Sequence, residues 1–183
     1  MLHKITQLLI SFCDTSGDNR EIIEYGIVQG LNALIGISLT LLIGYVLGVF
    51  TQSIIFIVAL IPLRMYAGGY HADTQKRCAI ISILLMLIAI ITIRYVNVSS
   101  SLSLIIGLIE TGILFWIIPI DGNEKLEDIE KQVYRKRGRR ILIIEMIVFI
   151  FTRNELNIVF GTVFSIVLFL ELCGIAKNNI LKI

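Results

Sequence analysis

One histidine and one cysteine lie seven residues apart in the polar stretch RMYAGGYHADTQKRC, which separates two strongly apolar segments. Cysteine attacks carbonyl carbons as the thiolate, and histidine can accept the thiol proton or pair with the thiolate as imidazolium. His71 and Cys78 are therefore candidates for the base and the nucleophile of a cysteine hydrolase. The alternative is that Cys78 is a small buried hydrophobe and His71 a polar anchor at an apolar boundary.

The spacing of these two residues sets a condition on the structure. On one continuous helix they would share a face but stand about 10 Å apart, whereas proton transfer needs a contact of about 3 Å. The segment between them must therefore fold back, and Gly68 and Gly69 allow the positive φ angles that such a turn uses. Asp73 or Thr74 is a suitable N-cap for the next helix, which would place Cys78 in its first turns.

A metal site is a weaker reading of the same stretch. His71, Asp73 and Cys78 lack the close paired spacing that is typical of zinc ligands. We therefore predict no metal and no cofactor.

The composition of the chain indicates a membrane protein. Its 183 residues are 56% hydrophobic and 16% charged, against about 45–50% apolar and about 25% charged in soluble domains. A helix needs about 20 apolar residues to cross a hydrocarbon core of about 30 Å. Six apolar blocks approach this length to different degrees: Ile27–Phe50 exceeds it, Leu102–Ile120 and Ile158–Ala176 nearly meet it, Cys78–Ile93 is somewhat short, and Ser53–Leu63 and Ile141–Thr152 are shorter still.

The basic residues predict how these blocks are threaded. Fourteen of the sixteen Lys and Arg lie before the first block or in alternate gaps and the tail, and only Arg94 and Arg153 lie in the other gaps. Short loops rich in Lys and Arg stay on the cytoplasmic side. We therefore expect a multi-pass membrane protein with both termini, and the 64–78 stretch, on the cytoplasmic side.

The predicted fold is one all-α integral membrane domain over residues 1–183. It has about six transmembrane helices, some of them short or only partly spanning. Apolar residues recur at helical spacing over residues 1–17, which predicts an N-terminal amphipathic helix lying on the inner leaflet. Two small-xxx-small glycine pairs in the first span, Gly26/Gly30 and Gly44/Gly48, would let helices approach closely.

Three carboxylates inside the predicted spans suggest a different function. Glu110, Glu145 and Glu171 would be costly at membrane depth, and such groups usually face a bundle interior or a wet cavity. A transporter or channel would use them directly. Structural roles, near an interface or hydrogen-bonded to a neighbouring helix, are the other interpretation.

The pattern R-x-x-x-G-G-x-H-x-x-x-x-x-x-C, present as Arg64, Gly68, Gly69, His71 and Cys78, resembles the signature of the accessory gene regulator B family. The chain is also similar to that family in its length, in the EYG stretch that opens the first span, in the six predicted spans, and in the basic loop before the fifth span. The resemblance covers essentially the whole chain.

The resemblance implies a membrane-embedded cysteine endopeptidase of quorum sensing in the bacterial cell membrane. Its substrate would be a small precursor peptide with an amphipathic leader and an acidic tail. Cys78 would be the nucleophile and His71 its base, and the thioester left after tail removal would be attacked by a thiol or hydroxyl of the substrate to close a ring. The resemblance also implies a homodimer.

Further residues have predicted roles that remain open. Arg64 would hold a substrate carboxylate or steady the loop, with a topology anchor as the alternative. Gly69 would serve the loop backbone, Asp73 would orient His71, and Gln29 is a polar residue of the first span that would reach the site. A basic segment would bind the acidic tail of the precursor, or else only set topology and meet anionic lipid; its members are Lys131, Arg135, Lys136, Arg137, Arg139 and Arg140. A nucleic-acid partner is not expected on so short a membrane loop.

Overall fold

The computed structural model describes residues 18–70, 72, 74–119, 127–152 and 155–180, and these residues form six α-helices and no strand. The predicted amphipathic helix over residues 1–17 lies outside the described residues. The six helices are α2 (Asp18–Val46), α3 (Phe50–Ala67), α4 (Gln75–Tyr95), α5 (Ser100–Ile117), α6 (Asp128–Phe151) and α7 (Glu155–Ile180). The all-helical fold class predicted from the sequence is confirmed.

Four helical segments are long and apolar enough to cross a membrane: Gly26–Val46, Phe50–Ala67, Lys76–Tyr95 and Leu156–Asn179. Two apolar blocks that the sequence suggested were too short are therefore parts of longer helices, because α3 and α4 extend beyond the uninterrupted hydrocarbon runs. The apolar part of α5 is shorter, covering Ser101–Ile117. It ends before Pro119, since the residue preceding a proline is disfavoured in a helix.

Helix α6 combines a charged first half with an apolar second half. It opens with a capping box in which the side chains of Glu127 and Glu130 each accept from the other residue's backbone N–H, an arrangement that satisfies donors left free at a helix start. The predicted Ile141–Thr152 block is thus the apolar end of one long helix.

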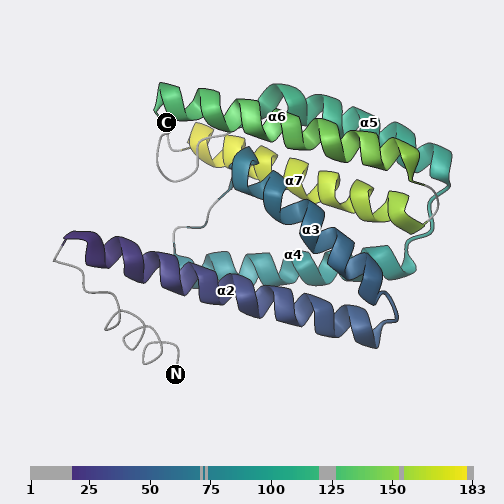
Figure 1. Ribbon diagram of the computed structural model, residues 1–183, viewed down its shortest axis with the longest axis horizontal. Coiled ribbons are helices and arrows are strands. Elements are labelled where there is room, and N and C mark those ends of the chain that lie inside the picture. The colour runs from purple at the N-terminus through teal and green to yellow at the C-terminus, as the bar shows by residue number, and fades with distance from the viewer. Residues whose placement is uncertain (1–17, 71, 73, 120–126, 153–154, 181–183) are drawn as a thin grey trace.

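Helix α7 is the centre of the bundle. It packs against α3, α4, α5 and α6, whereas α2 packs only at one side, against α3 and α4. The start of α2, the α3–α4 link, the start of α6 and the end of α7 all lie at the same end of the molecule (Figure 1). The segments that carry most of the basic residues therefore share one end.

Close helix contacts depend on particular glycines. Gly107 of α5 lies against the Phe149 ring of α6, where an added Cβ would approach a ring carbon to 2.5 Å. Gly44 of α2 lies directly against Ser53 of α3 in the same way. A Cβ added at Gly26 or Gly30 would meet nothing within 4 Å. The close approach that this pair allows is therefore not used within the described residues.

Candidate active site

The helix break that the His/Cys chemistry requires is present. Helix α3 ends at Ala67 and α4 begins at Gln75. Gly68 and Gly69 have φ angles of 87° and 88°, a region that residues with a Cβ rarely adopt. The two glycines therefore turn the chain out of α3, as their sequence suggested.

Helix α7 holds the link that follows this turn. The Tyr70 N–H donates to the Leu170 carbonyl over 3.0 Å. Gly174, one turn further along α7, leaves room for the link, because a Cβ there would lie 2.9 Å from both the Gly69 carbonyl carbon and the Tyr70 nitrogen. The backbone of the link is thus seated directly on the backbone of α7.

Arg64 connects the link to a buried carboxylate. One of its terminal nitrogens donates to the Tyr70 carbonyl over 2.8 Å, and the other lies 3.7 Å from Oε1 of Glu171. The Glu171 side chain is fully buried. Its Oε1 would be 2.7 Å from a Cβ at position 69, so Glu171, Arg64 and Gly69 form one contiguous cluster.

Cys78 lies in the first turns of α4. Thr74 is the N-cap, its hydroxyl accepting from the Arg77 N–H over 3.4 Å, and the Cys78 N–H donates to the Thr74 carbonyl over 3.0 Å. The Cys78 side chain is half-buried and free. A thiol in the first turns of a helix lies near the partial positive charge of the helix N-terminus, which favours a negatively charged nucleophile.

Two predicted site residues, His71 and Asp73, lie outside the described residues. The distance from His71 to Cys78 therefore stays a prediction. Gln29 lies half-buried on α2, and its predicted reach to the site also stays a prediction.

The basic segment of α6 lies beside the end of α3. The Arg137 guanidinium is 5.8 Å from the centre of the Tyr66 ring, and the Tyr66 and Tyr134 rings meet edge to face at 5.7 Å. The two helices come close here, since a Cβ added at Gly138 would lie 3.4 Å from the Tyr66 Cβ. Tyr66 comes two residues before Gly68, so the basic segment lies close to the start of the link.

The six basic residues of this segment are not equivalent. Arg139 donates from Nε to the Phe115 carbonyl over 3.0 Å and lies 4.5 Å from the centre of that ring, so it joins α6 to α5. Arg137 has its contact with Tyr66, and Lys131 is half-buried with a contact of its own. The side chains of Arg135, Lys136 and Arg140 are exposed.

The three carboxylates of the predicted spans have different surroundings. Glu110 accepts from the Ser165 hydroxyl over 2.7 Å, Glu171 pairs with Arg64, and Glu145 is buried on α6 beside a small apolar cavity. No three acidic, His or Cys side chains come together among the described residues. The three carboxylates therefore do not build one shared site there.

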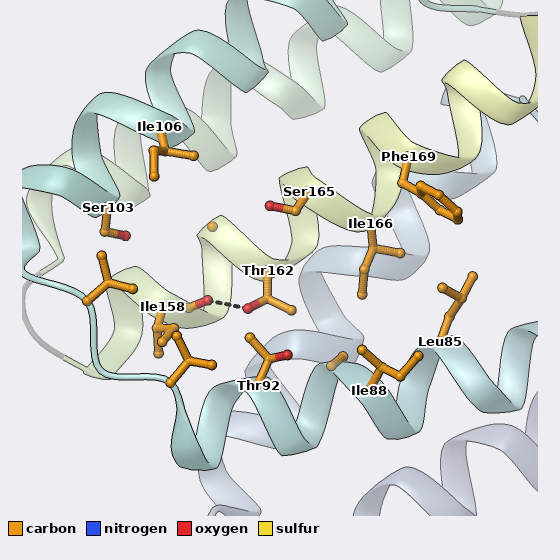
Figure 2. Close-up of a pocket in the computed structure, with 14 residues that line it drawn as sticks. Leu85, Ile88, Thr92, Ser103, Ile106, Ile158, Thr162, Ser165, Ile166 and Phe169 are labelled. Carbon is orange, nitrogen blue, oxygen red and sulfur yellow. Dashed lines mark hydrogen bonds between the residues drawn. The ribbon is translucent and has the colours of Figure 1, made fainter.

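A large apolar cavity lies among the helices (Figure 2). It has a volume of about 410 Å³ and lies between α4, α5 and α7, with Leu85, Ile106 and Phe169 among its walls. The Thr162 hydroxyl at its edge donates to the Ile158 carbonyl over 2.7 Å (Figure 2). No Cys, His, Asp or Glu lines it, and its polar side chains are the hydroxyls of Thr92, Ser103, Thr162 and Ser165.

Several members of the site were not predicted together from the sequence. Glu171 was recognised as an intramembrane carboxylate but not as the partner of Arg64, and Leu170 and Gly174 were not recognised at all. The signal that was available was the unusual position of Glu171 in an apolar helix. Nothing in the sequence pairs it with a residue on α3.

The fold and the link define a multi-helix membrane protein with a half-buried free cysteine at a broken helix. The family model for accessory gene regulator B matches residues 2–175. The chain belongs to the accessory gene regulator B family, which acts in quorum sensing and in the processing of a precursor peptide.

Curated relatives agree with this assignment. A protein described as AgrB-like from Clostridium perfringens (strain 13 / Type A) is 25% identical over 161 residues, which cover 82% of this chain and 75% of the relative. Accessory gene regulator protein B of Staphylococcus aureus (strain MW2) is 26% identical over 110 residues, covering 60% of this chain and 58% of the relative. No solved structure matches the chain.

Proposed function

We propose that this protein is a membrane-embedded cysteine endopeptidase that removes the C-terminal tail of a small precursor peptide and promotes closure of a thiolactone or lactone ring. Cys78 is the nucleophile and His71 the base. The observation that carries the proposal is the helix break, which ends α3 at Ala67 and begins α4 at Gln75, just before Cys78. A continuous helix would have kept the base and the sulfur about 10 Å apart.

The proposed reaction has two acyl transfers. The Cys78 thiolate attacks the carbonyl carbon at the end of the signal segment, the peptide C–N bond breaks, and the imidazolium of His71 gives its proton to the leaving amine. The tail departs with a new N-terminus, and the signal segment remains as a thioester. A thiol or hydroxyl of the substrate then loses its proton to His71 and attacks the thioester carbonyl, which closes the ring and releases Cys78.

The membrane setting supports ring closure over hydrolysis. An internal nucleophile competes with water when it is held close to the thioester in a partly dry site, and orientation of this kind contributes about 7–11 kcal/mol. Cys78 is half-buried at the start of an apolar helix. Its surroundings therefore suit an intramolecular acyl transfer.

The exposed basic residues of α6 are the proposed contact for the acidic tail. Arg135, Lys136 and Arg140 are exposed, and their segment lies beside Tyr66 at the end of α3. The tail begins directly after the cleaved bond, so a binding surface for it has to lie near the link. Arg137 and Arg139, which have contacts within the chain, are assigned mainly to holding α6 in place.

The test of the peptidase is substitution of its two reacting groups. Cys78→Ala and His71→Ala are expected to lower tail removal from a precursor peptide with an amphipathic leader and an acidic tail by at least about a thousandfold, while the protein still accumulates in the membrane. Cys173→Ala is the matched control, because Cys173 is also free and half-buried and is not expected to affect cleavage. Normal cleavage by Cys78→Ala would remove the assignment.

The tail contact is tested by neutralising the exposed basic residues together. The Arg135→Gln/Lys136→Gln/Arg140→Gln variant is expected to raise KM for the precursor about tenfold and to weaken its dependence on salt. Arg94→Gln is the control, since Arg94 is exposed in the last turn of α4, at the far end of that helix from the link. An unchanged KM and salt dependence would show that the segment does not bind the tail.

The membrane orientation is part of the same proposal. We place both termini, the α3–α4 link and the basic start of α6 on the cytoplasmic side. The start of α2, the end of α7, the link and the start of α6 share one end of the molecule (Figure 1) and carry most of its Lys and Arg. The open Gly26/Gly30 face of α2 is the proposed contact with a second copy of the chain.

A further inference from the structure

We propose that Glu171 of α7, together with Gly174, positions the α3–α4 link for catalysis, so that α7 is a working part of the site although it carries neither reacting group. The inference rests on the proposed function. It assigns a role to a buried carboxylate that the reaction itself does not use.

The first argument is the direction of the contacts. Both peptide groups of Tyr70 hold the link in place. The Tyr70 N–H donates to the Leu170 carbonyl of α7 over 3.0 Å, and the Tyr70 carbonyl accepts from Arg64 over 2.8 Å. Tyr70 is the residue directly before the proposed base in the chain. Fixing its two peptide groups therefore fixes the point from which the reactive part of the link starts.

The second argument is that Arg64 needs a counter-charge to hold its place. Its other terminal nitrogen is buried and has no hydrogen-bond partner within the described residues, and the nearby anion is Glu171 at 3.7 Å. Within the same residues, neither Glu171 oxygen receives a hydrogen bond. Because removing one member of a buried pair leaves the other charge uncompensated, each residue depends on the other for its position.

The third argument is steric. Glu171 Oε1 and the Leu170 carbonyl lie 2.7 Å and 3.1 Å from the point where a Cβ would stand at Gly69, and the link backbone leaves no room for a Cβ at Gly174. One turn of α7 therefore supplies a hydrogen-bond acceptor, a charge and a close backbone contact to Gly69 and Tyr70 of the link and to Arg64 of α3. If Glu171 served only to neutralise Arg64, it would not have to lie against the backbone of Gly69.

The experiment compares two isosteric substitutions of buried carboxylates. Glu171→Gln is expected to lower kcat for tail removal about ten- to a hundredfold, with KM changed less than about twofold, because a displacement of about 1 Å can cost a factor of about a hundred. Glu145→Gln is the control, since Glu145 is also a buried carboxylate in an apolar helix segment but has no contact with the link. Glu145→Gln is expected to cleave as the unchanged protein does.

A second measurement reports on the link without any substrate. Hydrogen exchange of the Tyr70 amide, followed by mass spectrometry in the Cys78→Ala background, is expected to accelerate in Glu171→Gln and not in Glu145→Gln. The Arg64→Gln/Glu171→Gln double variant is expected to lose no more kcat than the worse single variant, because the two residues act as one unit. Additive losses would mean that Glu171 does not act through Arg64.

The outcomes separate this inference from the peptidase assignment. If Cys78→Ala abolishes cleavage while Glu171→Gln matches Glu145→Gln in both kcat and exchange, the peptidase stands and the positioning role is refuted. If Cys78→Ala cleaves normally, the peptidase and the catalytic role of Glu171 fall together. If Glu171→Gln does not accumulate in the membrane, Glu171→Asp replaces it, with an intermediate loss of kcat expected and an unchanged kcat refuting the inference.

Discussion

Adding one methyl group to α7 at Gly174 should impair the site without weakening the helix. In Gly174→Ala the new Cβ would lie 2.9 Å from the Gly69 carbonyl carbon and the Tyr70 nitrogen, and 3.0 Å from the Gly69 Cα. Ordinary van der Waals contacts of a Cβ lie at 3.4–4 Å. The atoms it meets are backbone, which cannot rotate away, so the link has to retreat by about 0.5–1 Å.

The expected energies favour a catalytic effect over unfolding. Replacing glycine by alanine inside a helix contributes about 1 kcal/mol of helix stability. This gain offsets part of the cost of overpacking, which is about 1–3 kcal/mol. The folded protein should therefore persist. A shift of about 1 Å in the link is enough to lower kcat about ten- to a hundredfold.

The assay is tail removal by membrane preparations matched for protein level, with Gly161→Ala as the control. Gly161 is on the same helix, and a Cβ there would meet only the Ser103 hydroxyl at an ordinary 3.6 Å. Gly161→Ala is expected to keep the original kcat. Equal kcat values for the two variants would refute the view that α7 sets the position of the link.

Two further predictions concern stability. Arg139→Ala is expected to lower the free energy of unfolding in detergent by about 1–3 kcal/mol, because it removes both the hydrogen bond to the Phe115 carbonyl and the contact with the Phe115 ring. The side chain of Arg140 is exposed, so an equal loss in Arg140→Ala would contradict the view that Arg139 joins α6 to α5. Phe149→Ala is expected to cost about 3 kcal/mol, since its ring is fully buried and would leave a cavity, whereas Phe151→Ala, at 82% exposed, should not change the thermal midpoint.

Much of the fold could be predicted because the signals are local. Apolar blocks and alternating basic segments indicated six helices, and the glycine pair and Thr74 indicated where α3 ends and α4 begins. The main errors were lengths: α3 and α4 extend into polar residues at their ends, because a helix already formed continues through residues such as Arg64 that need not lie in hydrocarbon.

The candidate site could be predicted only in part. The sequence by itself determined that Cys78 lies in the first turns of a helix that follows a glycine turn, because capping and positive φ are properties of neighbouring residues. Only the tertiary structure decided that Glu171, more than a hundred residues from Arg64 in the chain, is its partner, and that Gly174 faces the link. Periodicity shows which side of a helix is apolar, but the helix that covers that side is chosen by packing between distant segments, and no local pattern records that choice.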